Sequence, residues 1–213
     1  VTNRAYERLV EEPFAGRTEK ELAWRTEQLF HELGGDGLAF PVDVAGGPTA
    51  ASPHAVPGDR VVEEGELVLV DAGALLAGYC SDCTRTFAVG DVSDSLREAY
   101  EIVRDAQGAG LDAVRAGASG RDADAAARAV ITDAGYGENF GHGLGHGVGL
   151  LVHEAPVLRP ESEDVLAAGN VVTVEPGIYL SGVAGIRIED LVVVTKDGCE
   201  VLTSFPKELI TVN

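Results

Sequence analysis

Four carboxylates and one imidazole lie in apolar, strand-like stretches of this chain of 213 residues. Acidic side chains are rarely buried in proteins unless they are paired or bind a cation. Carboxylates that converge in a partly buried site raise each other's pKa, whereas divalent cations would neutralise them. A single acid in such a stretch could end a strand or form an ion pair, but five residues of this kind together favour a metal site. They are Asp71, Asp82, His146, Glu175 and Glu189.

Oxygen ligands with a single nitrogen suit manganese, cobalt, iron(II) or zinc. Two divalent ions would balance four carboxylates, and a pair roughly 3.5 to 4 Å apart acidifies a bridging water, which is then available as hydroxide near neutral pH. The sequence therefore predicts a dinuclear metallohydrolase. We expect two divalent ions, with manganese as the first choice and cobalt, zinc or iron as alternatives.

The carboxylates follow or interrupt runs that are typical of β-strands. Asp71 closes the run 67–70, and residues 79–89 are expected to form the return strand that carries Asp82. Both carboxylates could then face one cleft.

The second pair of acids is placed in a similar way. Glu175 follows the run 171–174, and Glu189 is expected within a strand over residues 186–194. Arg187 would lie on the same strand face as Glu189, where it could either pair with a carboxylate or contact a substrate.

An approximate internal repeat relates the two halves of the chain at an offset of 101 residues. In each half a capping pattern opens a helix that runs to a glycine: Thr18 with Glu21 before Gly34, and Ser119 with Asp122 before Gly135. Strands rich in valine and isoleucine follow in both halves, and each half supplies two of the acids. The repeat predicts an α+β domain of two pseudo-twofold related halves, about 1–92 and 93–213, with the metal site at their junction.

Composition restricts the classes of protein. The formal net charge of -19 argues against nucleic acid or an anionic membrane as a partner. No apolar run reaches the length of about 18 residues that spans a bilayer. Three cysteines, Cys80, Cys83 and Cys199, do not form an even disulfide framework, so a reducing cytoplasm is the expected location.

Five ordered motifs resemble the pita-bread metallopeptidases of family M24, in the branch of Xaa-Pro aminopeptidases and Xaa-Pro dipeptidases (prolidases). The motifs are DAG at residue 71, GYCSDCTRTF at 78, GHGLGHGVGLLVHE at 141, VTVEPGIY at 172 and RIEDLVVVT at 187. The resemblance implies that Asp71 chelates one metal ion, that His146 and Glu175 hold the other, and that Asp82 and Glu189 bridge both.

The resemblance also gives roles to other residues. His54, His142 and His153 would line the substrate cleft, with His153 stabilising the tetrahedral intermediate and His54 and His142 orienting the substrate. Glu175 would also carry a proton to the leaving nitrogen.

The implied function is hydrolysis of the Xaa-Pro bond at the N-terminus of peptides or in dipeptides, by a metal-bridging hydroxide. The substrates would be peptides with proline at the second position. The alternatives are a peptidase similar to the methionine aminopeptidases and a non-catalytic peptide-binding module.

The chain begins with valine and contains no methionine, so we expect a fragment of a longer protein. Residues 1–213 would be a single catalytic domain. Members of this branch carry a further N-terminal domain that narrows the cleft and supports dimers, and we expect that domain to precede this chain. A homodimer is therefore one assembly to test.

Overall fold

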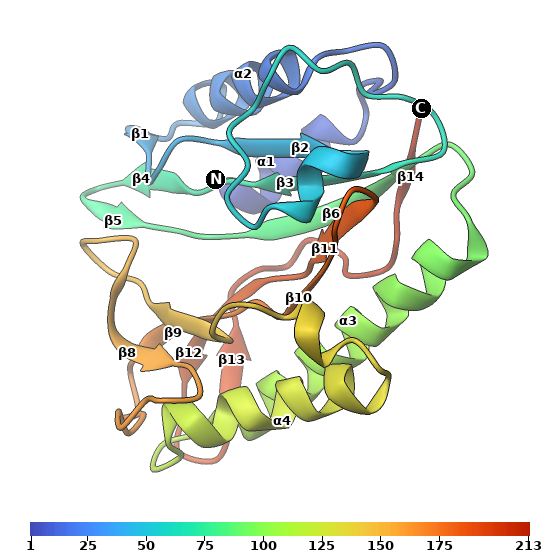
Figure 1. Ribbon diagram of the computed structural model, residues 1–213. Coiled ribbons are helices and arrows are strands. Elements are labelled where there is room, and N and C mark those ends of the chain that lie inside the picture. The colour runs from blue at the N-terminus through green and yellow to red at the C-terminus, as the bar shows by residue number, and fades with distance from the viewer.

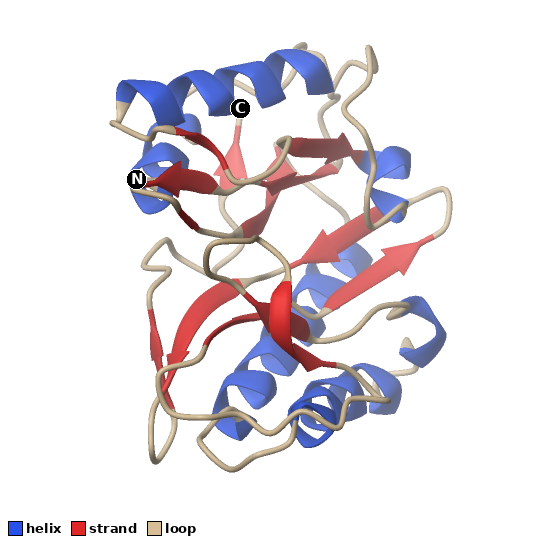
Figure 2. Cartoon of the chain, turned by 90° about the vertical axis from the view of Figure 1, so that its left-hand side faces the viewer, coloured by secondary structure: helices blue, strands red, loops and turns tan.

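Two β-sheets stack at the centre of the molecule, with helices on the outer side of each. The computed structural model describes residues 1–213. In Figure 1, α1 (Thr2–Leu9) and α2 (Glu19–Glu32) lie with the upper sheet, whereas α3 (Asp94–Ala113) and α4 (Gly120–Asp133) lie with the lower one. Figure 2 shows the same layers from the side. The arrangement is α+β, as the sequence predicted.

The upper sheet has the strand order β14-β6-β3-β2. Its strands are β2 (Asp43–Gly46), β3 (Leu67–Asp71), β6 (Thr84–Val89) and β14 (Thr211–Val212). Strand β3 is antiparallel to both of its neighbours, so that Asp71 lies opposite Asp43 on one side and opposite Thr84 on the other. A small sheet of β1 (Gly37–Leu38), β4 (Ala74–Leu76) and β5 (Tyr79–Cys80) lies where the chain passes from β3 to β6, and the short helix η1 (Gly47–Ala51) follows β2.

The lower sheet has the strand order β13-β12-β9-β7-β8. Its strands are β7 (Gly145–Gly147), β8 (Glu154–Leu158), β9 (Val171–Val174), β12 (Asp190–Val194) and β13 (Cys199–Val201). A separate hairpin of β10 (Gly177–Leu180) and β11 (Ala184–Arg187) leads from β9 to β12, and the short helix η2 (Gly137–Asn139) follows α4.

The capped helices of the repeat form as predicted. The Thr18 hydroxyl accepts a hydrogen bond from the backbone N–H of Glu21, whose carboxylate accepts one from the N–H of Thr18. The Ser119 hydroxyl accepts the corresponding bond from the N–H of Asp122. The glycines that end both helices, Gly34 and Gly135, have φ values of 90° and 87°, a left-handed conformation that glycine adopts without strain.

Two predictions of continuous strands are wrong, because each expected strand is interrupted at its acidic residue. Residues 79–89 form two strands, and Asp82 lies in the irregular segment between β5 and β6. Residues 186–194 are likewise divided, so that Glu189 lies between β11 and β12 and does not share a strand face with Arg187. Each acid therefore leaves the regular ladder where its side chain turns toward the site.

Two hydrophobic clusters form the core. One contains buried residues of the first helices and the upper sheet, together with Phe205 and Val212 from the C-terminal segment. The other packs α3 and α4 against the lower sheet. The C-terminal segment thus returns to the upper layer, where β14 pairs in parallel with β6. None of the helices is both long and apolar enough to cross a membrane.

Candidate metal centre

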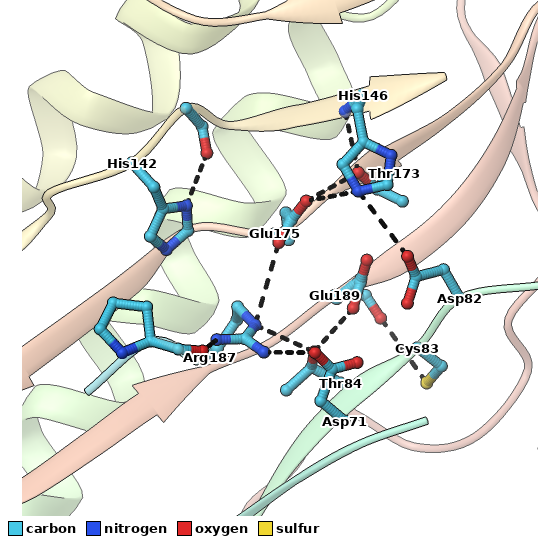
Figure 3. A network of polar contacts seen from close by, with 12 residues as sticks. Asp71, Asp82, Cys83, Thr84, His142, His146, Thr173, Glu175, Arg187 and Glu189 are labelled. Atoms are coloured by element: carbon cyan, nitrogen blue, oxygen red, sulfur yellow. Dashed lines mark hydrogen bonds and ion pairs between the residues drawn. The ribbon is translucent and has the colours of Figure 1, made fainter. Parts of the chain in front are cut away.

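The five predicted ligands converge between the two layers, and each comes from a different segment (Figure 3). One ligand atom from each of three of them, Asp82, His146 and Glu189, lies within 4.8 Å of the others. Glu175 forms an ion pair with His146 of this group, and Asp71 forms one with Arg187 beside it. Two of the four acids thus come from each of the expected halves of the chain.

The backbone fixes the orientation of the His146 imidazole. Its Nδ1 lies 3.1 Å from the carbonyl oxygen of Gly147, to which it donates. The other nitrogen, Nε2, therefore faces the carboxylates, at 3.2 Å from Glu175 Oε1 and 3.7 Å from Asp82 Oδ2. A histidine whose Nδ1–H is held by a carbonyl presents Nε2 as a ligand in this way.

The charges around His146 show how strongly this position favours a cation. Burial lowers the pKa of His146, but the hydrogen bond to Glu175 and the charges of Glu175 and Glu189 outweigh it and raise the pKa to about 9. Burial raises the pKa of Glu175, yet its bond to His146 and the nearby positive charges lower it to about 2. The metal-free chain therefore holds an imidazolium against a carboxylate.

Glu189 and Asp82 carry the opposite shift. Burial raises the pKa of Glu189, and the charges of Glu175 and Asp71 raise it further. The pKa of Asp82 is raised in the same way, first by burial and then by Glu189. The Thr84 hydroxyl donates to Glu189 Oε2 at 2.7 Å and fixes the direction of that carboxylate.

Arg187 connects Asp71 to the rest of the centre. Its side chain is 3% exposed, and Nη2 donates to Asp71 Oδ2 at 2.6 Å. Its Nε donates to the Thr84 hydroxyl at 3.0 Å and lies 3.9 Å from Glu175 Oε2. Of the two uses open to Arg187, the structure contains the pairing with a carboxylate, while contact with a substrate stays a prediction.

These residues fit divalent cations. Two buried carboxylate oxygens at the centre, Asp71 Oδ1 and Glu189 Oε1, have no hydrogen-bond partner. An unpaired buried oxygen costs free energy, and a cation would supply the missing interaction. Four carboxylates and one imidazole are also a donor set that such ions accept.

Three other histidines, His54, His142 and His153, lie around the centre at different depths. The ring of exposed His153 stacks edge-on against His146, with their centroids 4.3 Å apart. His142 lies deeper, where its Nε2 is 2.8 Å from the Tyr179 hydroxyl, and burial lowers its pKa. His54 is exposed and follows Pro53, whose carbonyl accepts a hydrogen bond from Arg187. Their roles in binding substrate stay predictions.

Sequence reasoning missed several residues that hold or border the centre. The Tyr179 hydroxyl accepts a hydrogen bond from Arg187 Nη1 and lies 2.8 Å from His142 Nε2, so that it links the two side chains. The tyrosine is part of the EPGIY motif. Asp43 lies opposite Asp71 in neighbouring strands, so that the two side chains share a face of the sheet. Burial and the charge of Asp71 raise the pKa of Asp43 to about 6. The acid within the apolar run VDVAG could have indicated that Asp43 borders the site.

Tyr6 supports the site from helix α1. Its hydroxyl lies 3.0 Å from the Val70 carbonyl and 2.6 Å from the Cys83 carbonyl, and those two residues are the chain neighbours of Asp71 and Asp82. Nothing in the spacing of the N-terminal helix indicated this contact.

Comparison with known proteins agrees with the geometry. The family model for metallopeptidase family M24 matches residues 1–196. The chain is 45% identical over 195 residues to an uncharacterized peptidase of Bacillus subtilis, covering 92% of this chain and 55% of the relative. It is 42% identical to an Xaa-Pro dipeptidase of Pyrococcus horikoshii, covering 99% of this chain and 60% of that protein.

Solved structures show the same likeness. An X-Pro aminopeptidase from Thermotoga maritima matches with a TM-score of 0.97 at 44% identity, covering 99% of this chain and 60% of the other. An Xaa-Pro dipeptidase from Bacillus anthracis matches with a TM-score of 0.97 at 47% identity, covering 99% of this chain and 59% of the other. The chain therefore spans between 55% and 60% of the length of these relatives.

Proposed function

Because this chain belongs to metallopeptidase family M24, we propose that it hydrolyses the bond between an N-terminal residue and a following proline, in dipeptides or longer peptides. The family implies a peptidase that uses divalent metal ions. The observation that carries the proposal is the convergence of the five predicted ligand residues around buried carboxylate oxygens that lack a hydrogen-bond partner. Relatives named as Xaa-Pro dipeptidases and an X-Pro aminopeptidase support the choice of substrate.

In this proposal Asp71, Asp82, His146, Glu175 and Glu189 hold two divalent ions, with manganese as the first choice. When bound, such ions would supply an acidified water and a Lewis acid for the substrate carbonyl.

The side chains around the ligands then have separate tasks. Glu175, whose second oxygen faces Arg187, would carry a proton to the leaving nitrogen. His153 lies at the exposed side of His146, where it would donate a hydrogen bond to the developing oxyanion. His142 and His54 would orient the peptide.

The test is hydrolysis by the metal-stripped chain after manganese, cobalt or zinc is restored. Three substrates separate the subclasses: an Xaa-Pro dipeptide, an Xaa-Pro-Xaa tripeptide and a Met-Ala-Ser peptide. We expect metal-dependent cleavage of a proline-containing substrate. Cleavage of Met-Ala-Ser alone would instead support a methionine aminopeptidase activity, and tight metal binding without any cleavage would support a peptide-binding role for this chain.

A further inference from the structure

Arg85 is the largest fully buried side chain in the molecule, and its guanidinium lies at the junction of the two halves. It belongs to β6, directly after Thr84, which bonds to the Glu189 carboxylate. The side chain is 1% exposed and forms an ion pair with Asp190, which is 0% exposed. No part of the proposed reaction uses either residue.

Each N–H of Arg85 has an acceptor in the structure. Nη1 donates to the backbone carbonyls of Thr84 and Glu189, the second in a very short contact. Nη2 donates to Asp190 Oδ1 and to the carbonyl of Phe205, each at 2.8 Å. Nε donates to the carbonyl of Pro206 at 3.0 Å. One guanidinium thus joins β6, the start of β12 and the returning C-terminal segment.

The second carboxylate oxygen of Asp190, Oδ2, also has two partners. Gln107 Nε2, from α3, donates to Asp190 Oδ2 at 2.9 Å. Lys207 Nζ lies 3.0 Å from the same oxygen and donates to Gln107 Oε1 at 2.9 Å. The aspartate therefore cannot move without breaking bonds to a helix and to the C-terminal segment.

This network lies directly behind two of the proposed ligands. The N–H of Glu189 donates to the carbonyl of Thr84 at 3.1 Å, and Arg85 bonds to the carbonyls of both residues. Asp82 is two residues before Thr84 on the same segment. The distance between the Asp82 segment and the Glu189 segment is consequently set at the point where Arg85 joins them.

Stability alone does not explain such a network. Taking two charges out of water is costly, and apolar side chains of similar volume are often equally stabilising. A planar guanidinium with five fixed donors does, however, impose a geometry that apolar side chains cannot.

We propose that Arg85, held by Asp190, is a positioning residue that sets the separation of Asp82 and Glu189, so that both carboxylates can contact two metal ions at once. This proposal rests on the metal centre of the proposed function. It predicts that loss of the Arg85 bonds weakens binding of the second ion more than binding of the first.

The experiment compares Arg85→Lys with the unaltered chain. Lysine keeps the charge beside Asp190 but cannot reproduce the five bonds. Manganese binding to the metal-stripped proteins is measured by calorimetric titration, and the spin coupling between two bridged manganese ions is measured by electron paramagnetic resonance. We expect the second ion to bind about 10- to 100-fold more weakly in Arg85→Lys, with affinity for the first ion nearly unchanged and the coupled signal lost.

Arg60→Lys is the matched control. Arg60 also forms a two-bond pair with a partly buried carboxylate, Glu66, but contacts none of the ligand segments. We expect its binding isotherm and its coupled signal to equal those of the unaltered chain.

The outcomes separate the two proposals. If the unaltered chain binds no second manganese ion, the proposed metal centre is wrong. If it binds two, and folded Arg85→Lys binds both with unchanged affinity and coupling, the positioning role is overturned, even where the melting temperature falls. Should Arg85→Lys not fold, Lys207→Met perturbs the same network from a side chain that is 31% exposed. Unchanged second-site affinity in that variant would overturn the proposal, and a several-fold loss would support it.

Discussion

At the scale of single residues, the metal centre brings together more negative than positive side chains. Four carboxylates share a small volume with two cationic side chains, His146 and Arg187. The imidazolium compensates the charge beside Glu175, and the guanidinium does so beside Asp71. Burial and the neighbouring carboxylates still raise the pKa values of Asp82 and Glu189 well above the ordinary range, because the nearby cations only partly offset them.

We predict that Asp82→Ala loses binding of one metal ion and lowers turnover of an Xaa-Pro substrate by at least about 100-fold, since even residues that only support a ligand commonly cost 10- to 100-fold. Metal content after gel filtration and steady-state kinetics check this. Full activity with two bound ions would show that Asp82 is not a ligand.

His153→Ala should separate catalysis from metal binding. His153 stacks on His146 but does not belong to the group of ligand atoms, so both ions should remain bound. We expect kcat to fall about 100- to 1000-fold, which is typical for removal of one oxyanion donor. His31→Ala, on a side chain that is 52% exposed on α2, is the control and should behave as the unaltered chain. Loss of metal from His153→Ala would contradict its assigned role.

Asp43 makes the stability of the metal-free chain depend on pH. Its pKa is about 6 in the folded chain, above the ordinary value of 3.8, so the folded state holds the proton more tightly than the unfolded state. The contribution to stability is fully present below pH 3.8 and is lost as the pH rises through 6. The charges of Asp71, Arg187 and His54 act on it together with burial.

We therefore expect the free energy of unfolding of the unaltered, metal-free chain to fall by about 1 kcal/mol more than that of Asp43→Asn between pH 4 and pH 7, after allowance for solvent screening at this half-buried side chain. Urea titrations across this range measure the difference. Parallel curves for the two proteins would show that Asp43 has an ordinary pKa.

Residues could be predicted where a local sequence pattern marks them, and could not where their importance comes from distant contacts. Asp71 and Glu175 end apolar runs and were placed correctly at the ends of β3 and β9. Arg85 and Tyr179 lie within the quoted motifs, yet their importance comes from partners that are distant in sequence, such as Asp190 and Arg187. Local patterns cannot reveal such pairs.

At the scale of elements, close approach of strands determines the position of His146. A Cβ added at Gly145 in β7 would lie 2.1 Å from the backbone oxygen of Thr173 in β9. Only glycine allows the two strands to come this close, and Thr173 in turn bonds to Glu175.

Gly145→Ala should push β7 away from β9 and displace His146. We expect a loss of about 1 to 3 kcal/mol in the free energy of unfolding, as for other overpacked sites, together with weaker manganese binding. Gly141→Ala is the control, because a Cβ at Gly141 meets nothing within 4 Å. Urea unfolding and metal titration test both variants, and equal behaviour of the two would refute the close-approach argument.

The broken strands at Asp82 and Glu189 have a common physical cause. A residue within a regular strand points its side chain perpendicular to the sheet, and its backbone bonds to neighbouring strands. Both acids instead lie between strands, outside the regular ladder, and their carboxylates point toward the junction. Neither break contains a glycine or proline, so no residue that commonly ends a strand marks it.

At the scale of the whole molecule, the repeat allowed two of the helices to be predicted. The caps and the glycines that end them located α2 and α4, since these signals are local. The order of strands in the two sheets was not predictable, because pairings such as β14 with β6 join segments that are distant in the chain. The pita-bread fold followed from the resemblance of the motifs.

Metal should also hold the two layers together. The ligands come from both halves, and the chain has a formal net charge of -19, so bound cations relieve repulsion as well as cross-linking the layers. With free manganese at 100 times its Kd, we expect a gain of about 2.7 kcal/mol for one site. Unfolding is compared with and without manganese at equal ionic strength, with Asp82→Ala as the control that should gain less. No gain in the unaltered chain would exclude tight binding to the folded state.

The return of the C-terminal segment has a consequence for biosynthesis. Phe205 and Val212 complete the cluster that otherwise consists of residues from the first helices and the upper sheet. The ribosome makes the rest of that cluster well before these two residues. Part of the apolar surface of the upper layer must therefore stay uncovered until residues 205–212 have been made, although the other members of its cluster end at Val89. The upper layer can therefore complete its core only after the cluster of the lower layer, which extends to Val194, has been made.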